Sequence, residues 1–423
     1  MQVPPSRWHA ARAALACVAA GLLAGAVPPA GAAEITVCPT CPVSSVRGAI
    51  AAAAPGDRIR IETGTYREGT ITVDKPLALI GEGEAVLDGE GKVEVLVVRA
   101  DGVTVRGLVI ANSGMSYVHD LAGIRAEGVR DCRIAGNRVD NCFFGIYLAQ
   151  VVACEVEDNV VTGRAVDETS SGNAIHLWNV DHVRVRRNQA RGHRDGIYLE
   201  FARAVTVEDN VSERNLRYGL HFMFSEGNEY ARNVFRHSNA GVAVMYSKRV
   251  AMRENRFEDN WGPAAYGLLL KDMSDSEVVG NRFRRNTTAL YAEGANRVAV
   301  DGNRFERNGW AVRIMADSMG VVFAHNQFVG NTFEVATNGT RSYNTFAENF
   351  WSDYRGYDLD RDGIGDVPHR PVRLFSMLVE RYPPALILLR SPFLDMLDLA
   401  ERVLPILTPR VLADHRPRMR SHP

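Results

Sequence analysis

The stretch Asp301-Gly-Asn-Arg-Phe-Glu-Arg-Asn-Gly-Trp-Ala311 is one copy of a unit that recurs along most of the chain. Each copy has a short alternating strand, an asparagine, an apolar residue two positions later and a small residue that opens another strand. The marker asparagine recurs at ten positions: Asn137, Asn159, Asn188, Asn210, Asn233, Asn255, Asn281, Asn303, Asn326 and Asn349. Successive separations are 22, 29, 22, 23, 22, 26, 22, 23 and 23 residues. A period of this size with two insertions is typical of a solenoid built from one stacked unit.

Strands this short leave no room for the crossover helices of a βαβ sheet, and their alternation excludes helical repeats. We therefore predict an all-β fold, a right-handed parallel β-helix of about ten coils of the pectin-lyase type, with a short helical C-terminal tail. The marker asparagines are expected to be structural, because Asn tolerates the left-handed turn conformation and stacked amides bond from coil to coil. The apolar positions from Phe235 to Trp351 are expected to stack as an interior ladder.

The N-terminus carries Arg7 and Arg12, then an apolar run over residues 13–27, then small residues up to Ala33. This pattern predicts a signal peptide at 1–33 and export to the periplasm, and about 15 apolar residues are too few for a membrane span. The mature chain is predicted to comprise a β-helix with an N-terminal cap at 34–350, an acidic capping motif at 351–371 and a helical tail at 372–423. A small amphipathic helix within 44–54 is expected to form the N-terminal cap.

The chain has 49 basic and 50 acidic residues, for a formal net charge of -1. Such a balance gives no overall field that would attract nucleic acid, so partners must be inferred from local features.

Five cysteines remain after the predicted cleavage. Cys38 and Cys41 form a close pair, for which a structural disulfide is favoured over a redox pair or a soft-metal clip. Cys132 and Cys154 are one repeat apart and should stack on neighbouring coils, where parallel Cβ directions favour two free core thiols. Cys142 has no evident partner.

The strand that follows each small residue has an unusual outward face, because alternation assigns its aliphatic residues to the interior. The outward residues include Tyr, His, Trp and Met, where Lys, Glu and Thr are usual on a surface that meets only water. We expect a binding face that includes the following residues: Tyr147, His176, Trp178, Tyr198, Glu200 and Lys271. Loops inserted at 112–122, 166–172 and 260–265 point the same way, because insertions on a solenoid often form its binding side.

Met223 and Met245 should occupy one column on neighbouring coils, and His221 lies two residues before Met223 on the same face. Two thioethers and an imidazole suit Cu(I) better than a hard ion. The sequence therefore suggests a Cu(I) site at these three residues, with a packed surface under a loop as the alternative.

After the last marker, Asp358, Asp360, Asp362 and Asp366 follow a D-x-D-x-D-G-x-x-D pattern around Gly363. Alternate carboxylates at a sharp glycine turn are typical of a Ca²⁺ loop, although a carboxylate twelfth ligand is missing. A solvated acidic turn is the alternative. The tail beyond it has short apolar segments broken by prolines, which either pack on the solenoid or dock on a partner.

Several runs in this sequence resemble the NosD family of periplasmic nitrous oxide reductase maturation proteins, with β-helix repeats of the carbohydrate-binding and sugar-hydrolase type. The resemblance rests on residues 194–200, 217–225, 242–247, 267–271 and 308–312, on the acidic run 354–368, and on tail residues 389–392 and 399–402. It covers essentially the whole mature chain.

The resemblance implies a periplasmic accessory protein that is not an enzyme. It implies that the protein works with the membrane and ATPase components of an ABC transporter and with a copper chaperone while the copper-sulfur site of nitrous oxide reductase is assembled. The resemblance supplies no list of metal ligands, and whether copper, a sulfur species or only a protein partner meets the outward face stays open.

The rival function is a polysaccharide lyase, epimerase or hydrolase, with Asp195, Glu200, Glu293 and Lys271 as acids and bases. Against it, Glu200 and Glu293 should lie about four coils apart, too far for a carboxylate pair.

Overall fold

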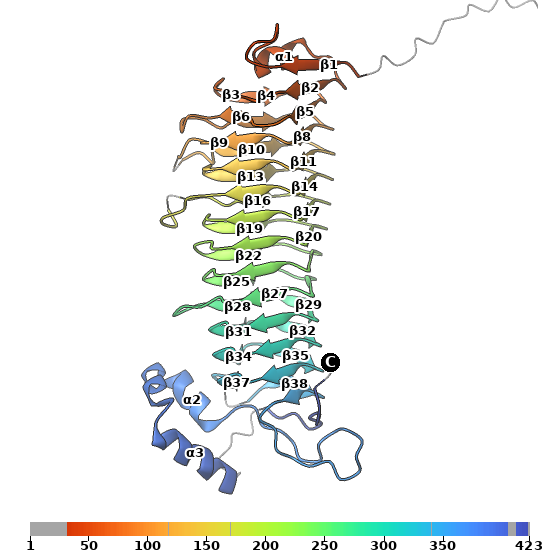
Figure 1. Cartoon of the computed structure of the whole chain (residues 1–423). Coiled ribbons are helices and arrows are strands. Elements are labelled where there is room, and N and C mark those ends of the chain that lie inside the picture. Colours follow the sequence, from red (N-terminus) through yellow and green to blue (C-terminus); the bar gives the residue numbers. More distant parts are fainter. Residues whose placement is uncertain (1–31, 117, 170, 340, 405–411, 422–423) are drawn as a thin grey trace, which may run out of the picture. The chain divides into compact units, whose positions relative to one another are not determined.

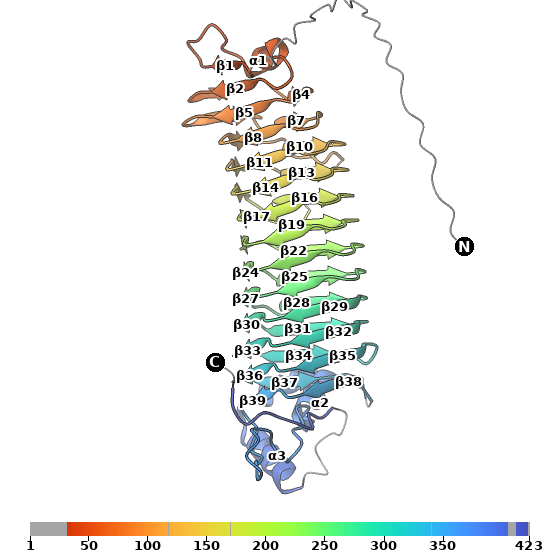
Figure 2. The same cartoon turned by 90° about the vertical axis from the view of Figure 1, so that its right-hand side faces the viewer.

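The computed structural model describes residues 32–116, 118–169, 171–339, 341–404 and 412–421, and most of these residues form a parallel β-helix (Figures 1 and 2). The predicted signal peptide, apart from its last two residues, lies outside the described residues. Successive strands pair in parallel to form three long sheets, here called sheets A, B and C. In the described residues the sheets contain 14, 13 and 12 strands, so the solenoid has about 14 coils. The prediction of about ten coils was wrong because the coils before Asn137 lack the marker asparagine.

The strands of the three sheets follow one another in the order A, B, C along most coils. Sheet A contains β1 (Glu34–Val37), β2 (Arg58–Ile61), β5 (Ala78–Gly81), β8 (Thr104–Arg106), β11 (Arg133–Ala135), β14 (Glu155–Glu157), β17 (Arg184–Arg186), β20 (Thr206–Glu208), β23 (Glu229–Ala231), β26 (Ala251–Arg253), β29 (Ser274–Val279), β32 (Asn296–Asp301), β35 (Met319–Ala324) and β38 (Tyr343–Ala347). Sheet B contains β3 (Gly64–Tyr66), β6 (Ala85–Asp88), β9 (Val109–Ala111), β12 (Arg138–Asp140), β15 (Val160–Thr162), β18 (Gln189–Arg191), β21 (Val211–Glu213), β24 (Val234–Arg236), β27 (Arg256–Glu258), β30 (Arg282–Arg284), β33 (Arg304–Glu306), β36 (Gln327–Val329) and β39 (Phe350–Trp351). Sheet C contains β4 (Ile71–Val73), β7 (Leu96–Val98), β10 (Ala122–Glu127), β13 (Phe144–Ala149), β16 (Ile175–Trp178), β19 (Asp195–Glu200), β22 (Tyr218–Met223), β25 (Ala240–Met245), β28 (Tyr266–Lys271), β31 (Thr288–Glu293), β34 (Trp310–Ile314) and β37 (Phe333–Ala336).

The ten marker asparagines form a continuous ladder at the corner between sheets A and B. The backbone N–H and the side-chain Nδ2 of each asparagine donate to Oδ1 of the next one, at 2.8–3.0 Å. Each Nδ2 also donates to a backbone carbonyl, as Asn281 does to Met252 at 2.8 Å. The predicted structural role of these asparagines is confirmed.

From the sequence we expected the asparagine to make the left-handed turn at this corner. In the structure the residue before the asparagine makes it. Arg187 (φ 54°) and Asp209 (φ 57°) are examples, and glycine takes this position at Gly302. The asparagine side chain is directed along the ladder, and the exposed preceding residue adopts the positive φ.

The interior is filled by columns of identical or similar apolar residues. Phe257, Phe283, Phe305 and Phe328 stack with ring centroids 4.5–4.9 Å apart, and Trp351 lies 4.0 Å below the last of them. All are at most 1% exposed, as the sequence predicted. Each such burial contributes about 1.5–3 kcal/mol.

Two disulfides lie in the described residues. The Cys38–Cys41 disulfide confirms the favoured prediction. Cys132 and Cys154 also form a disulfide across neighbouring coils, so the prediction of two free thiols was wrong. Their Cα atoms are only 4.5 Å apart, near the spacing of paired strands, and at that distance the side chains meet despite their similar directions.

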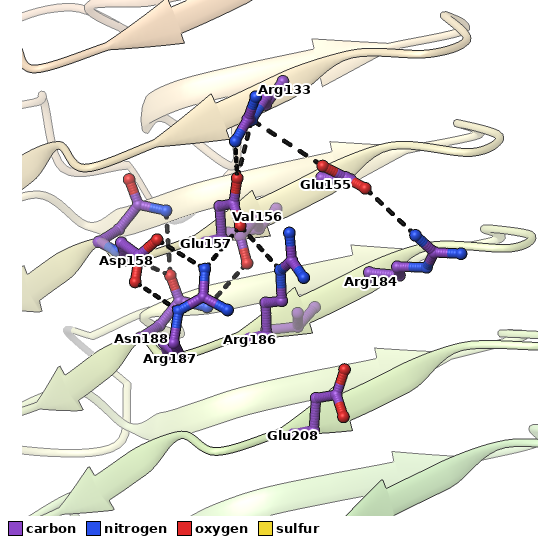
Figure 3. Close-up of polar contacts among 12 residues, drawn as sticks. Arg133, Glu155, Val156, Glu157, Asp158, Arg184, Arg186, Arg187, Asn188 and Glu208 are labelled. Carbon is purple, nitrogen blue, oxygen red and sulfur yellow. Dashed lines mark hydrogen bonds and ion pairs between the residues drawn. The ribbon is translucent and has the colours of Figure 1, made fainter.

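The outward side of sheet A is covered by ion pairs, as Figure 3 shows around Glu157. This glutamate is 1% exposed and accepts from Arg133, Arg186 and Arg187. Burial alone would raise the pKa of Glu157, but hydrogen bonds from Arg133 and Arg186 outweigh it and lower the pKa. Charges on this face are therefore satisfied within the protein.

Both ends of the solenoid are covered (Figure 1). Helix α1 (Val46–Ala52), with Ser45 as its N-cap, packs Val46 and Ile50 on the first coils, as predicted. At the other end lie α2 (Leu374–Arg381), the 3₁₀ helix η1 (Pro383–Leu388) and α3 (Pro392–Val403). Among the residues that the structure describes, every helix is too short or too polar to cross a bilayer.

The segment 412–421 returns to the last coil and ends the asparagine ladder. Asp414 is fully buried and accepts from the backbone and Nδ2 of Asn349, both at 3.0 Å, and from Nε1 of Trp351 at 3.1 Å. A carboxylate fits here because this last position only has to accept hydrogen bonds, whereas every asparagine above it must also donate.

We predict that Asn281→Asp lowers the free energy of unfolding by about 3 kcal/mol or more, because a buried carboxylate would face the carbonyl oxygens of Met252 and Val279. Asn338→Asp is the matched control, since Asn338 is exposed and, among the described residues, uses only its Oδ1, as an acceptor from Ala316. Denaturant unfolding of both variants measures the difference. Equal stability of the two would contradict the role assigned to the ladder.

Candidate metal and partner-binding face

Sheet C carries the predicted binding face on its outward side, and the strand register aligns it into columns. In the first column, Tyr147, His176, Tyr198 and His221 are direct neighbours on four successive coils. Ring centroids are 4.4, 4.8 and 5.0 Å apart along this series. Although they point outward, all four side chains are less than 10% exposed. They bury one another, which is unusual for the outside of a solenoid.

Burial lowers the pKa of His176 to about 3, so its imidazole is neutral at physiological pH. Its Nδ1 lies 2.9 Å from Nδ2 of Asn173 and accepts that hydrogen bond. Burial, together with the charge of Glu200, raises the pKa of Tyr198 above its usual value. These groups therefore add no charge to the face.

The second column contains Trp178, Glu200, Met223, Met245 and Lys271 in register. Met223 and Met245 are direct neighbours, as predicted, and both are half-buried. The Tyr198 hydroxyl lies 3.6 Å from the Met223 sulfur. A thioether and a phenol thus meet on this face, with the second methionine in register on the next coil.

His221 lies beside this pair and is 4% exposed. Neither Nδ1 nor Nε2 has a hydrogen-bond partner among the described residues. A buried imidazole without a partner loses its hydration without compensation. The three residues predicted to bind Cu(I) therefore share one region, and the imidazole among them makes no hydrogen bond within the described residues.

Asp195 is a buried carboxylate next to His221. Its two oxygens accept from Arg217 at 3.0 and 2.6 Å, and Nδ1 of His221 lies 3.9 Å away. Burial alone would raise the pKa of Asp195, but contacts with His221 and Arg217 outweigh it and lower the pKa. This carboxylate is thus held ionised and its oxygens are engaged.

The candidate acids and bases of a carbohydrate enzyme do not converge. Glu200 and Glu293 lie in one column four coils apart. Lys271 forms an ion pair with Glu293 at 3.3 Å, and Asp195 is paired with Arg217. The arrangement therefore offers no acid–base pair from these residues.

An exposed aromatic ridge borders the methionine column and was missed at the level of sequence. Phe201, Phe224 and Tyr246 stack 5.5 and 5.2 Å apart, each about 45% exposed and each at a positive φ. A bulky residue in this conformation is strained, and other coils place Asn179 or Asp272 there. The ridge could have been predicted from the sequence, because an aromatic residue replaces Asn or Asp at this position on three successive coils. Phe201, Phe224 and Tyr246 also line a surface hollow of about 450 Å³.

The acidic motif forms an exposed loop after the last coil. Carboxylate oxygens of Asp358, Asp360 and Asp362 lie within 4.8 Å of one another. Asp366 lies outside this group and caps the backbone N–H of Leu359 at 2.8 Å. Three of the four predicted ligands are therefore brought together.

The C-terminal helices pack on the last strands of sheet C. Phe375 and Val379 of α2 contact Trp310 and Phe333, and Arg313 forms an ion pair with Glu380 at 2.7 Å. The outer side of the same helices exposes apolar residues: Leu386, Ile387, Phe393, Met396, Leu399 and Val403. The tail thus packs on the solenoid and also presents an apolar surface.

Comparisons with known proteins agree with this architecture. Residues 157–356 match the family described as periplasmic copper-binding protein (NosD). The chain is 31% identical over 389 residues to the probable ABC transporter binding protein NosD of Pseudomonas aeruginosa, covering 87% of this chain and 89% of the relative. It is 28% identical over 384 residues to the protein of the same description from Stutzerimonas stutzeri, covering 86% and 87%.

Two solved structures share the fold alone. The Dettilon tailspike protein matches with a TM-score of 0.56 and 13% identity, covering 73% of this chain and 69% of that one. The Yersinia enterocolitica family 28 exopolygalacturonase matches with a TM-score of 0.53 and 12% identity, covering 74% and 75%. Identities this low say nothing about activity.

Proposed function

The chain belongs to the NosD family of periplasmic copper-binding proteins, and on that premise we propose that it is an accessory protein in the maturation of nitrous oxide reductase. In this proposal the protein is not an enzyme. It holds Cu(I) as cargo on the outward face of sheet C while an ABC transporter and a copper chaperone act with it.

The observation that carries the proposal is the group formed by His221, Met223 and Met245. The imidazole makes no hydrogen bond in the described part of the chain, although its Nδ1 lies 3.9 Å from the Asp195 carboxylate, and the two thioethers are neighbours on adjacent coils. Thioether ligands favour Cu(I), because soft donors match a soft ion, and imidazole also suits copper. Both methionines are half-buried, so a bound ion would remain accessible for transfer.

The rival function, a polysaccharide lyase, epimerase or hydrolase, is supported only by the shared fold. The carboxylates available on sheet C are too far apart or already paired, as Glu200 and Asp195 illustrate. The hydrogen-bonding groups of this face, such as Glu200 and Lys271, lie three coils apart in one column, with Met223 and Met245 between them.

Association with the transporter is assigned to the C-terminal helices. The two NosD relatives are described as probable ABC transporter binding proteins. In this chain Ile387, Met396 and Leu399 are 60–88% exposed and form an apolar surface without a covering element in the described residues. Exposed apolar patches of this kind are typical of protein–protein contacts.

We predict that Met223→Leu with Met245→Leu weakens Cu(I) binding by about tenfold or more and blocks reductase maturation, with an unchanged melting temperature. Leu has about the volume of Met, so the free energy of unfolding should change by less than about 1.5 kcal/mol. Leu nevertheless lacks the sulfur ligand. Anaerobic titration against a competing chelator measures the affinity. Met319→Leu, an exposed methionine on sheet A, is the control. Parental affinity and full maturation in the double variant would leave this column as a packing surface only.

We predict that Ile387→Ser, Met396→Ser and Leu399→Ser together abolish capture of the transporter components, with the melting temperature within about 2 °C of the parent, since exposed side chains contribute little to folding. Val118→Ser with Val166→Ser, at comparably exposed loop valines, is the control. Retained capture by the triple variant would place the docking surface elsewhere.

We also propose that Asp358, Asp360 and Asp362 bind Ca²⁺. Added Ca²⁺ should raise the melting temperature of the parent through binding to the native state, and Asp360→Ala with Asp362→Ala should remove that rise. Asp317→Ala, at an exposed turn, should keep it. A parent that does not respond to Ca²⁺ would exclude the site.

A further inference from the structure

Two histidines lie in the first column of sheet C, and the same ring atom of each faces a different kind of group. Nδ1 of His176 lies 2.9 Å from the amide Nδ2 of Asn173, which can only donate a hydrogen bond. Nδ1 of His221 lies 3.9 Å from Oδ2 of Asp195, and a carboxylate oxygen can only accept. The two imidazoles therefore meet opposite chemistry at Nδ1.

The group that faces Nδ1 decides which nitrogen of a neutral imidazole carries the proton. The Asn173 amide requires a lone pair on Nδ1 of His176, so the proton of that ring lies on Nε2. At His221, an Nδ1–H group is attracted to the Asp195 carboxylate, whereas a lone pair is repelled. A distance of 3.9 Å is too long for a hydrogen bond, but the electrostatic preference persists because His221 is 4% and Asp195 0% exposed. His221 thus carries its proton on Nδ1 and a lone pair on Nε2.

Nε2 of His221 is the ring atom left for a ligand. It is buried and has no hydrogen-bond partner in the part of the chain that the structure describes. The rings of Tyr198 and Tyr218 hold the imidazole, with centroids 5.0 and 4.7 Å from its own. The Tyr198 hydroxyl also lies 3.6 Å from the Met223 sulfur. One tyrosine therefore contacts both the imidazole and the thioether.

The two oxygens of Asp195 have different neighbours. Oδ1 accepts from the backbone N–H of Tyr218 at 3.2 Å and from Nε of Arg217 at 3.0 Å. Oδ2 accepts from Nη2 of Arg217 at 2.6 Å and is the oxygen 3.9 Å from His221. These bonds fix the orientation of the carboxylate, so the oxygen that faces the imidazole cannot turn away without breaking them.

We propose that Asp195 is a positioning residue of the Cu(I) site, which selects the His221 tautomer that offers its Nε2 lone pair to the ion. The inference rests on the function proposed above, because it requires Cu(I) at His221, Met223 and Met245. A carboxylate near the second ring nitrogen is the usual means by which proteins orient an imidazole ligand and set its tautomer. His176, with its proton on Nε2, does not offer that atom to an ion.

Asp195→Asn tests the proposal with little change in shape. Two N–H groups meet Oδ1, so the amide oxygen should take that place and the amide NH₂ group should face Nδ1 of His221. The proton of His221 should then move to Nε2, as the Asn173 amide already enforces at His176. Cu(I) binding should weaken by about tenfold or more, because the lone pair no longer points to the ion.

Two measurements read the outcome. Two-bond ¹H–¹⁵N NMR correlations of the imidazoles report the tautomer, which a loss of packing alone would not change. In the unaltered protein at pH 8, the proton should lie on Nδ1 of His221 and on Nε2 of His176. Added Cu(I) should shift the Nε2 signal of His221 and leave that of His176 unchanged.

Anaerobic titration against a competing chelator gives the Cu(I) affinities of the variants. Glu94→Gln is the matched control, since the Glu94 carboxylate also pairs with an arginine, Arg125, on this face. Arg125 lies three coils from Asp195, so this variant should keep the parental affinity.

A proton on Nε2 of His221 in the unaltered protein would overturn the proposal, and this spectrum does not depend on the folding of any variant. An unchanged tautomer in Asp195→Asn, or a changed tautomer with parental affinity, would overturn it as well. If Met223→Leu with Met245→Leu weakens binding and Asp195→Asn does not, the copper function stands and the role of Asp195 fails. If neither weakens binding, both proposals fail.

Discussion

The hydrogen bond from one marker asparagine to the next is the interaction on which the rest of the solenoid depends. Each coil from Asn137 onward turns sharply between sheets A and B, and the turn leaves backbone N–H groups in the interior. The amide oxygen of the following asparagine accepts them, and its Nδ2 donates onward, so each coil is satisfied by its neighbour. Such a chain of bonds has no natural end. Helix α1 covers the first coils, and the carboxylate of Asp414 ends the series where donors remain and no acceptor follows.

The hydrogen bonds at the corner and the packing of the interior determine the fold. The three outward faces are therefore free to differ. Sheet A pairs its charges internally, as Glu157 does with three arginines. Sheet C instead buries rings against one another and leaves His221 without a hydrogen bond in the described residues. Unsatisfied buried groups reduce stability, and a solenoid tolerates them because each coil interacts chiefly with its neighbours. The coils of sheet C that bear the chemistry lie in the middle of the stack, supported by regular coils on both sides.

The sequence predicted most of the fold because its signals were periodic. Marker spacing and alternation gave the coils, the stacked phenylalanines and the outward column from Tyr147 to His221. The first coils were missed because they have no marker asparagine. The Cys132–Cys154 disulfide was missed because it depends on the distance between the two Cα atoms, which the spacing in the sequence does not give. For the site, alternation aligned Met223 with Met245. It could not reveal that His221 makes no hydrogen bond within the described residues, because that depends on where Asp195 and Arg217 place their side chains.

The inserted loops show how a repeat protein gains a cavity without losing its period. A loop leaves the solenoid at one corner and returns to it, so the strands on either side keep their register, as Tyr147 and His176 do across the loop at 164–172. What changes is local: as the loop rejoins the solenoid, Gly172 bonds to Phe143 on one side and to Arg194 on the other, so Ser171 lies in register between Cys142 and His193. The 29-residue separation between Asn159 and Asn188 hides this pairing in the sequence, because Ser171 follows its marker asparagine by twelve residues and not by five. A lengthened repeat in a solenoid therefore adds a loop, and a cavity lined by loop residues such as Arg164 and Ser171, while the strands beside it keep their pairing.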